Sequence, residues 1–334
     1  MGLVSMLLLA AGLGGCRPVE RFDEFTGDTM GTYFRVRYVP AQCQPEVAAV
    51  SARLAQINAL MSTYDPDSQL SRFNAATSID PVIIDPELVS VLEAGLALWR
   101  DSQGAFDVTS GPLVNLWGFG AGQAVQVPTV AEQAQARALV GSDQLTLRGG
   151  QLSKAQAQVY VDLSAIAKGY AVDVVADMLR TQGCERLMVD IGGEMRLHGD
   201  SPRGGAWRIG IESPQPGAIG QLHQVLALRD LALATSGDYR NFRMIDGRRV
   251  DHLMDPRAGG PATSRIASAT VLHTQALWAD GYATTVMVLG EEAAMAFAER
   301  HEFALYLIIH DGSDAGFRTR YNAHMARYLA QTEG

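Results

Sequence analysis

The chain of 334 residues is poor in basic side chains. It carries 27 lysine and arginine residues against 36 aspartate and glutamate residues, which gives a formal net charge of −9. Because phosphate binding needs clustered lysine and arginine, this balance argues against nucleic acid as a partner. The remaining composition, 47% hydrophobic, is that of an ordinary soluble globular protein with ample length for a core, in one large domain or two small ones.

Long hydrophobic runs are also scarce. The apolar stretch at residues 1–16 is too short to span a bilayer as a stable anchor, and it ends in Leu13-Gly14-Gly15-Cys16. This ending resembles a lipobox, in which a signal peptidase cuts before the cysteine and the cysteine then carries lipid. The alternative is a plain apolar segment with an incidental cysteine. No lysine or arginine precedes the run, a departure that a true start codon further upstream would explain.

We therefore expect a signal peptide over residues 1–15, lipid-modified Cys16, a tether over residues 16–24 and a single domain over residues 25–334. A lipid anchor of this kind predicts that the protein sits on the periplasmic side of a bacterial membrane. Cysteine is scarce after Cys16, with only Cys43 and Cys184 remaining. A periplasmic setting permits a disulfide between them, and two separate buried thiols are the alternative.

The hydrophobic pattern predicts an α+β fold with mostly antiparallel sheets, because strands recur in hairpin-like groups with helices inserted between the groups. Asp246-Gly247 is a strong hairpin turn. Residues 105–122 are expected to form an ordered loop. Strands are expected over residues 32–39, 187–197, 207–212, 224–228, 231–235, 242–245, 249–253, 266–273 and 303–309, and helices over residues 46–61, 86–100, 129–140, 164–182, 275–290 and 291–301, with another near Tyr328.

A dinucleotide fingerprint is missing. Gly192-Gly193 interrupts the apolar strand over residues 187–197, which predicts either a bulge or a close approach of the backbone to a ligand. No GxGxxG motif and no Rossmann unit surround these glycines, so a nicotinamide dehydrogenase is excluded. Internal repeats and low-complexity runs are absent as well.

The helix over residues 275–290 carries two polar side chains on one face of an otherwise apolar element. Asp280 and Thr284 lie four residues apart, so they share that face. A carboxylate and a hydroxyl one turn apart are two oxygen ligands for a hard cation such as Mg²⁺. The alternative is a solvent-facing aspartate and a threonine bonded back to a helical carbonyl.

The junction between a strand and a helix near residues 162–171 is a second candidate site. Asp162 or Ser164 is expected to cap the first amides of the helix, and a helix start of this kind also binds phosphate oxygens. A third candidate is His252, which lies between Asp251 and Asp255 in sequence, so that a neighbouring carboxylate can orient or charge it. A structural role for this histidine is the alternative.

Five stretches together resemble the ApbE family, the FAD:protein FMN transferases, in the right order from about Phe25 to about Tyr306. They are Thr29-Met30-Gly31-Thr32, Asp162-Leu163-Ser164-Ala165-Ile166-Ala167-Lys168-Gly169-Tyr170-Ala171, Asp190-Ile191-Gly192-Gly193-Glu194, His252-Leu253-Met254-Asp255-Pro256, and Ala279-Asp280-Gly281 followed by Ala283-Thr284-Thr285 and Leu289-Gly290. Each stretch alone is weak, whereas five in order are specific. The resemblance implies one compact α+β unit with FAD in a cleft between two lobes.

The resemblance also implies residue roles. Mg²⁺ would be held by Asp280, Thr284 and the carbonyl of Ala165. His252 would be the general base, with Asp255 as its support, and Asp173 would support the fold. FAD would be contacted by Met30, Tyr64, Ala105, Phe106, Asp107, Asp162, Lys168 and Leu253, with Ser236-Gly237 lining the cleft. Tyr64 fits best on its own, because it lies in the polar break Ser62-Thr63-Tyr64-Asp65-Pro66, where an aromatic ring is exposed unless it stacks on a ligand.

The expected reaction is Mg²⁺-dependent transfer of FMN from FAD to a threonine or serine hydroxyl of an acceptor protein, with release of AMP. The resemblance implies acceptors such as flavoprotein subunits of membrane redox pumps that face the periplasm. Two alternatives stay open: an Mg²⁺-dependent FAD pyrophosphatase that gives FMN and AMP, and a non-enzymatic FAD-binding lipoprotein. Asp280, Thr284 and His252 together favour an enzyme over a binding protein.

Overall fold

An eight-stranded sheet is the centre of the structure, a computed structural model that describes residues 21–120, 127–215, 220–238, 242–245, 248–313 and 316–330. Every neighbouring pair in this sheet is antiparallel, as the sequence predicted. In spatial order the strands are β1 (Asp23–Thr29), β2 (Thr32–Tyr38), β6 (Leu187–Ile191), β7 (Glu194–His198), β10 (Ala232–Gly237), β15 (Ile266–His273), β16 (Ala304–His310) and β17 (Phe317–Tyr321).

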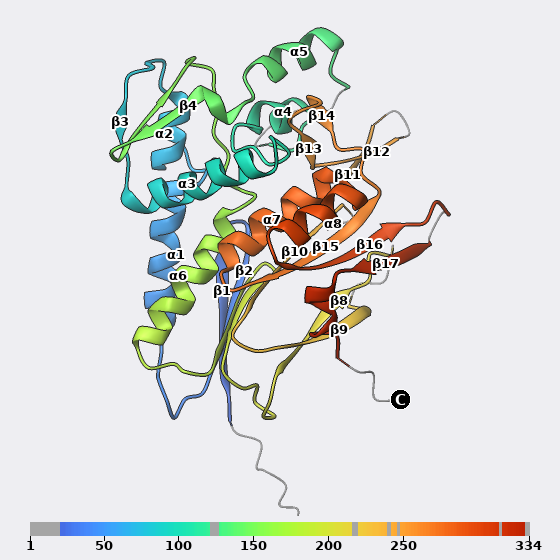
Figure 1. Ribbon diagram of the computed structural model, residues 1–334. Helices are drawn as coiled ribbons and strands as arrows, with labels where there is room; N and C mark the ends of the chain where they lie inside the picture. Colours follow the sequence, from blue (N-terminus) through green and yellow to red (C-terminus); the bar gives the residue numbers. More distant parts are fainter. Residues whose placement is uncertain are drawn as a thin grey trace, which may run out of the picture.

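Both faces of this sheet are covered. Helices α1 (Val47–Met61), α6 (Ala167–Thr181), α7 (Ala276–Leu289) and α8 (Glu291–Arg300) share one hydrophobic core with it, and α6 and α7 lie side by side (Figure 1). The hairpin of β8 (Trp207–Glu212) and β9 (Leu222–Leu228) and the short helix α9 (Ala323–Ala326) form a second core with the sheet. Strands covered on both faces need no polar face, which explains why β15 is buried from Ile266 to Leu272.

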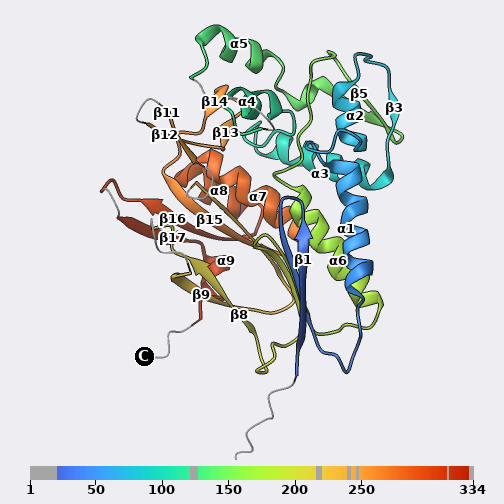
Figure 2. The same ribbon diagram turned by 180° about the vertical axis from the view of Figure 1, so that it is seen from behind.

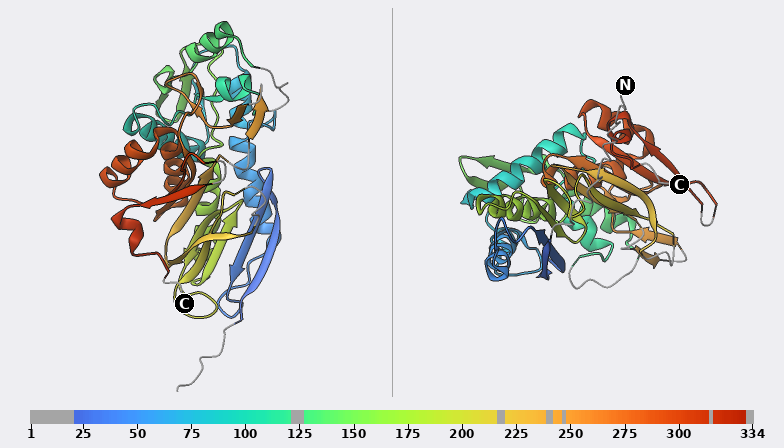
Figure 3. Two further views of the ribbon diagram at one scale, coloured as in Figure 1. Left: turned by 90° about the vertical axis from the view of Figure 1, so that its right-hand side faces the viewer. Right: turned by 90° about the horizontal axis from the view of Figure 1, so that it is seen from below.

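A second group of elements, here called the helical lobe, stands above the sheet in the side view of Figure 3 and again in the reverse view of Figure 2. Its helices are α2 (Gln69–Ala75), α3 (Pro86–Asp101), α4 (Gly111–Leu116) and α5 (Val130–Ala138). Its strands form a three-stranded sheet of β3 (Val82–Ile83), β5 (Gln151–Lys154) and β4 (Leu145–Arg148), and two hairpins, β11 (Phe242–Ile245) with β12 (Arg248–Asp251) and β13 (Met254–Asp255) with β14 (Gly260–Pro261).

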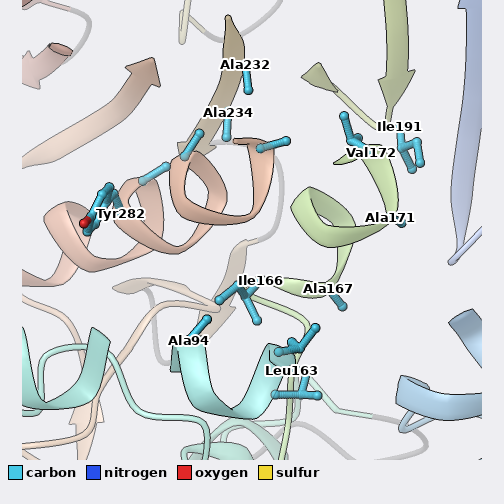
Figure 4. Close-up of a cluster of buried hydrophobic side chains, with 14 of the residues drawn as sticks. Ala94, Leu163, Ile166, Ala167, Ala171, Val172, Ile191, Ala232, Ala234 and Tyr282 are labelled. Carbon is cyan, nitrogen blue, oxygen red and sulfur yellow. The ribbon is translucent and has the colours of Figure 1, made fainter. Parts of the chain in front are cut away.

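Local capping signals explain some of the helix starts. Asp85 accepts a hydrogen bond from the Glu87 amide at the start of α3, where Pro86 occupies the first turn. Thr129 and Glu132 form a capping box at the start of α5. Figure 4 shows small buried side chains on α6 (Ala167, Ala171 and Val172) and on β10 (Ala232 and Ala234) in the cluster around α6, α7 and the sheet. Small side chains let these two helices and the sheet approach closely.

Three predicted boundaries were wrong. The helix expected from Ser164 begins at Ala167, because residues 164–166 form a turn. Gly192-Gly193 does not form a bulge: it is the turn that joins β6 to β7, with φ angles of 64° and 107° that only glycine adopts readily. Strand β1 includes Asp23 and Glu24, so these two residues belong to the sheet and not to the tether that was predicted over residues 16–24.

Two elements of the structure were not predicted, and two further predictions fall on residues that the structure does not describe. The expected loop over residues 105–122 contains helix α4, and strand β17 was not predicted. The Asp246-Gly247 turn lies outside the described residues, although its flanking strands β11 and β12 do pair. Cys16 and its apolar run also lie outside them. Within the described residues, no helix is both long and apolar enough to cross a membrane.

Cys43 and Cys184 form a disulfide bond, which settles the alternatives left open by the sequence. Their Cα atoms lie 5.2 Å apart although 141 residues separate them in the chain. The bond ties the segment before α1 to the segment between α6 and β6, so it links the first helix of the core to the centre of the sheet.

Candidate active site

A cavity of about 880 Å³ is lined by residues of both the sheet layer and the helical lobe, within the size range of small-molecule sites. It brings together almost all of the predicted site residues, which come from six separate stretches of the chain. Those that line it are Tyr64, Ala105, Phe106, Asp107, Asp162, Ala165, Lys168, His252, Leu253, Asp280 and Thr284, together with Ser236 and Gly237. Met30 and Asp255 are not among its described lining residues.

Asp280 is the most deeply buried of the described carboxylates that line this cavity, with 3% of its surface exposed. Its Oδ2 accepts a hydrogen bond from the Gly169 amide in the first turn of α6, at 2.9 Å. Burial raises the pKa of Asp280, while the nearby Lys168 and the Gly169 amide act in the opposite direction. The approach of α7 to α6 is close: a Cβ on Gly169 would lie 2.3 Å from the carbonyl oxygen of Ala276, so only glycine fits there.

Asp173 on α6 makes the reciprocal contact with the start of α7. Its carboxylate accepts hydrogen bonds from the amides of Ala276 and Leu277, both at 2.9 Å, and from the Arg196 guanidinium at 2.8 Å. Asp173 therefore supports the fold, as expected. Each helix start is held by a carboxylate of the other helix, and this fixes the position of Asp280 relative to α6.

Lys168 and Glu194 form an ion pair at the cavity wall, with Lys168 Nζ 2.5 Å from Glu194 Oε1. Glu194 is 4% exposed, and among the described residues its Oε2 has no hydrogen-bond partner. Burial raises the pKa of Glu194 to about 7; Lys168 opposes this rise and the Asp280 charge adds to it. No role for Glu194 was predicted from the sequence. Its position could have indicated one, because an acidic residue that directly follows the Gly192-Gly193 turn lies at the tip of the hairpin of β6 and β7.

The oxygen donors beside Asp280 suit a hard cation. Thr284 also lines the cavity, and its Oγ1 lies 3.4 Å from the hydroxyl of Ser236. The back-bonded threonine considered as an alternative is its neighbour Thr285, which donates to the Gly281 carbonyl at 2.7 Å. Across the described ranges no cluster of three or more His, Cys, Asp and Glu side chains forms a metal site. A cation here would therefore depend on one carboxylate, one hydroxyl, the Ala165 carbonyl and ligand oxygens.

Aromatic side chains line another part of the cavity. Tyr64 is 69% exposed, as the polar break around it predicted, and its amide is bonded to the Ser62 hydroxyl. Tyr160, Phe119 and Phe242 also line the cavity, and no sequence pattern pointed to them.

Phe106 and Asp107 have structural roles that the sequence did not indicate. Phe106 is 3% exposed and belongs to the main hydrophobic core, so its ring offers little surface for stacking. The Asp107 carboxylate accepts hydrogen bonds from the amides and hydroxyls of Thr109 and Ser142. Asp107 therefore shapes the loop that borders the cavity.

His252 lines the cavity, and the ring of Phe119 meets it edge-on at 6.3 Å between centroids. Asp255, the expected support of His252, is engaged by Arg257, whose Nε and Nη2 each lie 2.9 Å from a carboxylate oxygen. Burial alone would raise the pKa of Asp255, but the hydrogen bonds from Arg257 outweigh burial and leave this pKa below its ordinary value. Asp255 thus braces the turn between β13 and β14.

Met30 occupies the turn between β1 and β2, with a φ of 48°, and its side chain packs against the main core. The structure gives it no place among the described cavity residues. Its predicted contact with FAD stays a prediction, as do the chemical roles of the residues that line the cavity.

The fold is that of the flavin transferases. The structure matches that of the flavin transferase ApbE from Vibrio cholerae with a TM-score of 0.85 at 41% identity, covering 92% of this chain and 99% of that one. It matches the apo form of the Pseudomonas stutzeri flavinyl transferase ApbE with a TM-score of 0.84 at 38% identity, covering 92% and 97%.

The sequence comparisons agree. The model of the ApbE family matches residues 30–307. The FAD:protein FMN transferase of Vibrio cholerae is 42% identical over 341 residues, covering 99% of this chain and 98% of the relative, and that of Haemophilus influenzae is 39% identical over 330 residues, covering 96% and 94%. This chain belongs to the ApbE family, as its five motifs suggested, and is an enzyme of the flavin transferase class.

Proposed function

We propose that this enzyme transfers the FMN half of FAD to a threonine or serine hydroxyl of an acceptor protein and releases AMP. The observation that carries the proposal is the convergence of Lys168, Asp280, Thr284 and His252 on one cavity whose rim offers the exposed ring of Tyr64. Relatives of matching length named FAD:protein FMN transferase support it.

In this proposal each group has a defined task. The Tyr64 ring stacks on an aromatic ring of FAD, and the Lys168 ammonium pairs with the pyrophosphate. Asp280, Thr284 and the Ala165 carbonyl hold Mg²⁺, which when bound neutralises pyrophosphate charge. The acceptor hydroxyl oxygen forms a bond to the phosphorus of the FMN half while the bond from that phosphorus to the AMP oxygen breaks. His252 takes the hydroxyl proton, and AMP leaves with the bridging oxygen.

Incubation with FAD, Mg²⁺ and a candidate acceptor tests this proposal. We expect a covalent flavin adduct in the mass spectrum of the acceptor and an equal amount of AMP. Free FMN and AMP without an adduct would indicate an FAD pyrophosphatase, in which water replaces the hydroxyl. Retention of intact FAD would indicate a flavin-binding lipoprotein without enzymatic activity.

We also propose that the protein works on the periplasmic side of a bacterial membrane, anchored through lipid on Cys16, where flavoprotein subunits of membrane redox pumps are its acceptors. Two observations support this location: the Leu13-Gly14-Gly15-Cys16 ending of the apolar run, and the disulfide between Cys43 and Cys184, a bond typical of oxidising compartments. One acyl chain binds a membrane only weakly, so stable anchoring needs the several chains of a lipoprotein. An unmodified Cys16 in the mass of the mature protein would refute the anchor.

A further inference from the structure

Glu194 has no task in the proposed function, although its carboxylate lines the main cavity and is 4% exposed. Its Oε1 lies 2.5 Å from Lys168 Nζ. Within the described part of the chain no hydrogen-bond donor reaches its Oε2, which is buried. A buried carboxylate oxygen without a hydrogen-bond partner is costly, so this oxygen calls for a further partner inside the cavity.

The charges around Glu194 favour a cation in its neighbourhood. Glu194 and Asp280 are both buried, and the Lys168 ammonium lowers the pKa of each, so it lies close to both carboxylates. The Asp280 charge in turn raises the pKa of Glu194, as expected for two carboxylates that repel each other. Two carboxylates that share one ammonium leave a surplus of one negative charge.

The described lining of the whole cavity is acidic as well. Its charged residues, with histidine counted as neutral, are Asp107, Asp162, Glu194, Asp280, Lys168 and Arg243. Carboxylates therefore outnumber permanent cations. Arg243 lies over the ring of Phe119, which in turn meets His252, so its charge belongs to the His252 side of the cavity. A pyrophosphate could enter this lining favourably only together with a further cation.

We propose that Glu194 is a positioning residue for the cation: its charge strengthens the binding of Mg²⁺ by Asp280 and Thr284, and its Oε2 accepts a hydrogen bond from the hydration shell of the ion. This inference rests on the proposed function, which places the cation at those two residues. Mg²⁺ gives up water reluctantly and usually keeps several waters in proteins. Loss of a residue that hydrogen-bonds to the groups around a metal typically weakens metal binding by roughly 10- to 100-fold.

The ion pair predicts opposite effects on metal binding when it is broken from its two sides. Glu194→Gln keeps the size of the side chain and removes a negative charge, so a divalent cation should bind roughly tenfold or more weakly. Lys168→Met removes a positive charge that repels the cation, so the cation should bind more tightly. An ion pair that only braced the cavity wall would instead cause a loss in both variants.

The test is a titration with Mn²⁺, which replaces Mg²⁺ because electron paramagnetic resonance counts its free ion. Binding is measured on the purified protein without FAD, above pH 7, where Glu194 is charged. Asp280→Ala shows which part of the binding belongs to this site. Glu185→Gln is the matched control, since it makes the same change at an exposed position just before β6, at the opposite end of that strand from the Gly192-Gly193 turn. FAD affinity in metal-free buffer is measured on the same variants by flavin fluorescence.

We expect weaker Mn²⁺ binding by Glu194→Gln, tighter binding by Lys168→Met, and wild-type binding by Glu185→Gln. Wild-type Mn²⁺ affinity in Glu194→Gln would overturn the inference, and a loss of metal-free FAD affinity in that variant would then assign Oε2 to a hydroxyl of FAD.

Weaker Mn²⁺ binding in both Glu194→Gln and Lys168→Met would also overturn the inference, because it would leave the ion pair a purely structural role. If the wild type binds Mn²⁺ no better than Asp280→Ala does, the metal site of the proposed function fails itself, whatever Glu194→Gln shows.

Discussion

The Asp280 carboxylate accepts a hydrogen bond from the Gly169 amide at 2.9 Å, across the interface of α7 and α6. On the same interface Asp173 of α6 accepts from the first amides of α7. Two helices that exchange caps in this way cannot shift relative to one another without leaving backbone amides unpaired, which is costly in a buried interface. The only buried charge of the proposed metal site is therefore held in place before any ligand arrives.

The contact predicts that Gly169 tolerates no side chain. A Cβ there would lie 2.3 Å from the Ala276 carbonyl, which is backbone and cannot turn aside. We expect Gly169→Ala to lower the free energy of unfolding by roughly 1–3 kcal/mol, measured by urea denaturation. The control is Gly281→Ala on α7, whose Cβ would clash with the flexible end of the Leu98 side chain and touch Ile166 at ordinary contact distance, so this variant should cost less. Equal stability of Gly169→Ala and the wild type would show that the helices are not so close.

The proposed metal ligands and the proposed base should respond differently to added metal. Asp280→Ala removes the one charged ligand and should abolish most transfer, whereas Thr284→Val removes one oxygen and should be milder. High Mg²⁺ or Mn²⁺ should partly restore both variants. His252→Ala should slow transfer by roughly 10²-fold or more without any rescue by metal, and it should leave FAD binding intact. Full activity of Asp280→Ala without added metal would contradict the assignment.

Glu194 should make the stability of the protein depend on pH. Its pKa is about 7 in the folded protein against an ordinary 4.5, so between these values the folded chain still holds a proton that the unfolded chain has released. Stability from this group is therefore complete below about pH 4.5 and is lost as the pH rises through 7. Glu194→Gln removes this titrating group, so the free energy of unfolding of the variant should fall less steeply over the same pH range. Parallel pH profiles of the two proteins would refute the raised pKa.

The disulfide should contribute to stability through the length of chain that it closes. Cys43 and Cys184 are 141 residues apart, and cross-links of this length stabilise by up to about 5 kcal/mol through the entropy of the unfolded chain. We expect the Cys43→Ser, Cys184→Ser double variant to unfold at lower urea concentration, and reduced wild type to behave like the variant. If a reducing agent leaves the unfolding midpoint of the wild type unchanged, the bond does not stabilise the native state.

Where local chemistry decides the structure, the sequence predicted it well. The helix with Asp280 and Thr284 was expected to end near Gly290 and does end at Leu289, because an apolar run between a strand and a glycine has few alternatives. The exposure of Tyr64 followed from the polar residues around it. Most of the residues that the family resemblance pointed to do line the cavity, because the resemblance supplied the long-range contacts that spacing does not contain.

Local sequence patterns gave wrong predictions where a residue far away in the chain determines the local structure. Ser164 looked like a helix cap, but the first turn of α6 is held by Asp280, 111 residues away. Gly192-Gly193 looked like a break in one strand, because nothing in the sequence states that β6 and β7 pair with each other. The carboxylate of Asp255, the expected support of His252, is engaged by Arg257, and its support of His252 stays a prediction.

The central claim is that the cavity around Asp280 and His252 transfers FMN to a protein. Its most direct test is the intact mass of an acceptor after incubation with FAD and Mg²⁺, compared for the wild type and His252→Ala. The account predicts one covalent flavin on a threonine or serine and one AMP per adduct for the wild type, with adduct formation by His252→Ala slower by about two orders of magnitude. An acceptor of unchanged mass, or the same adduct formed at the same rate by His252→Ala, would contradict it.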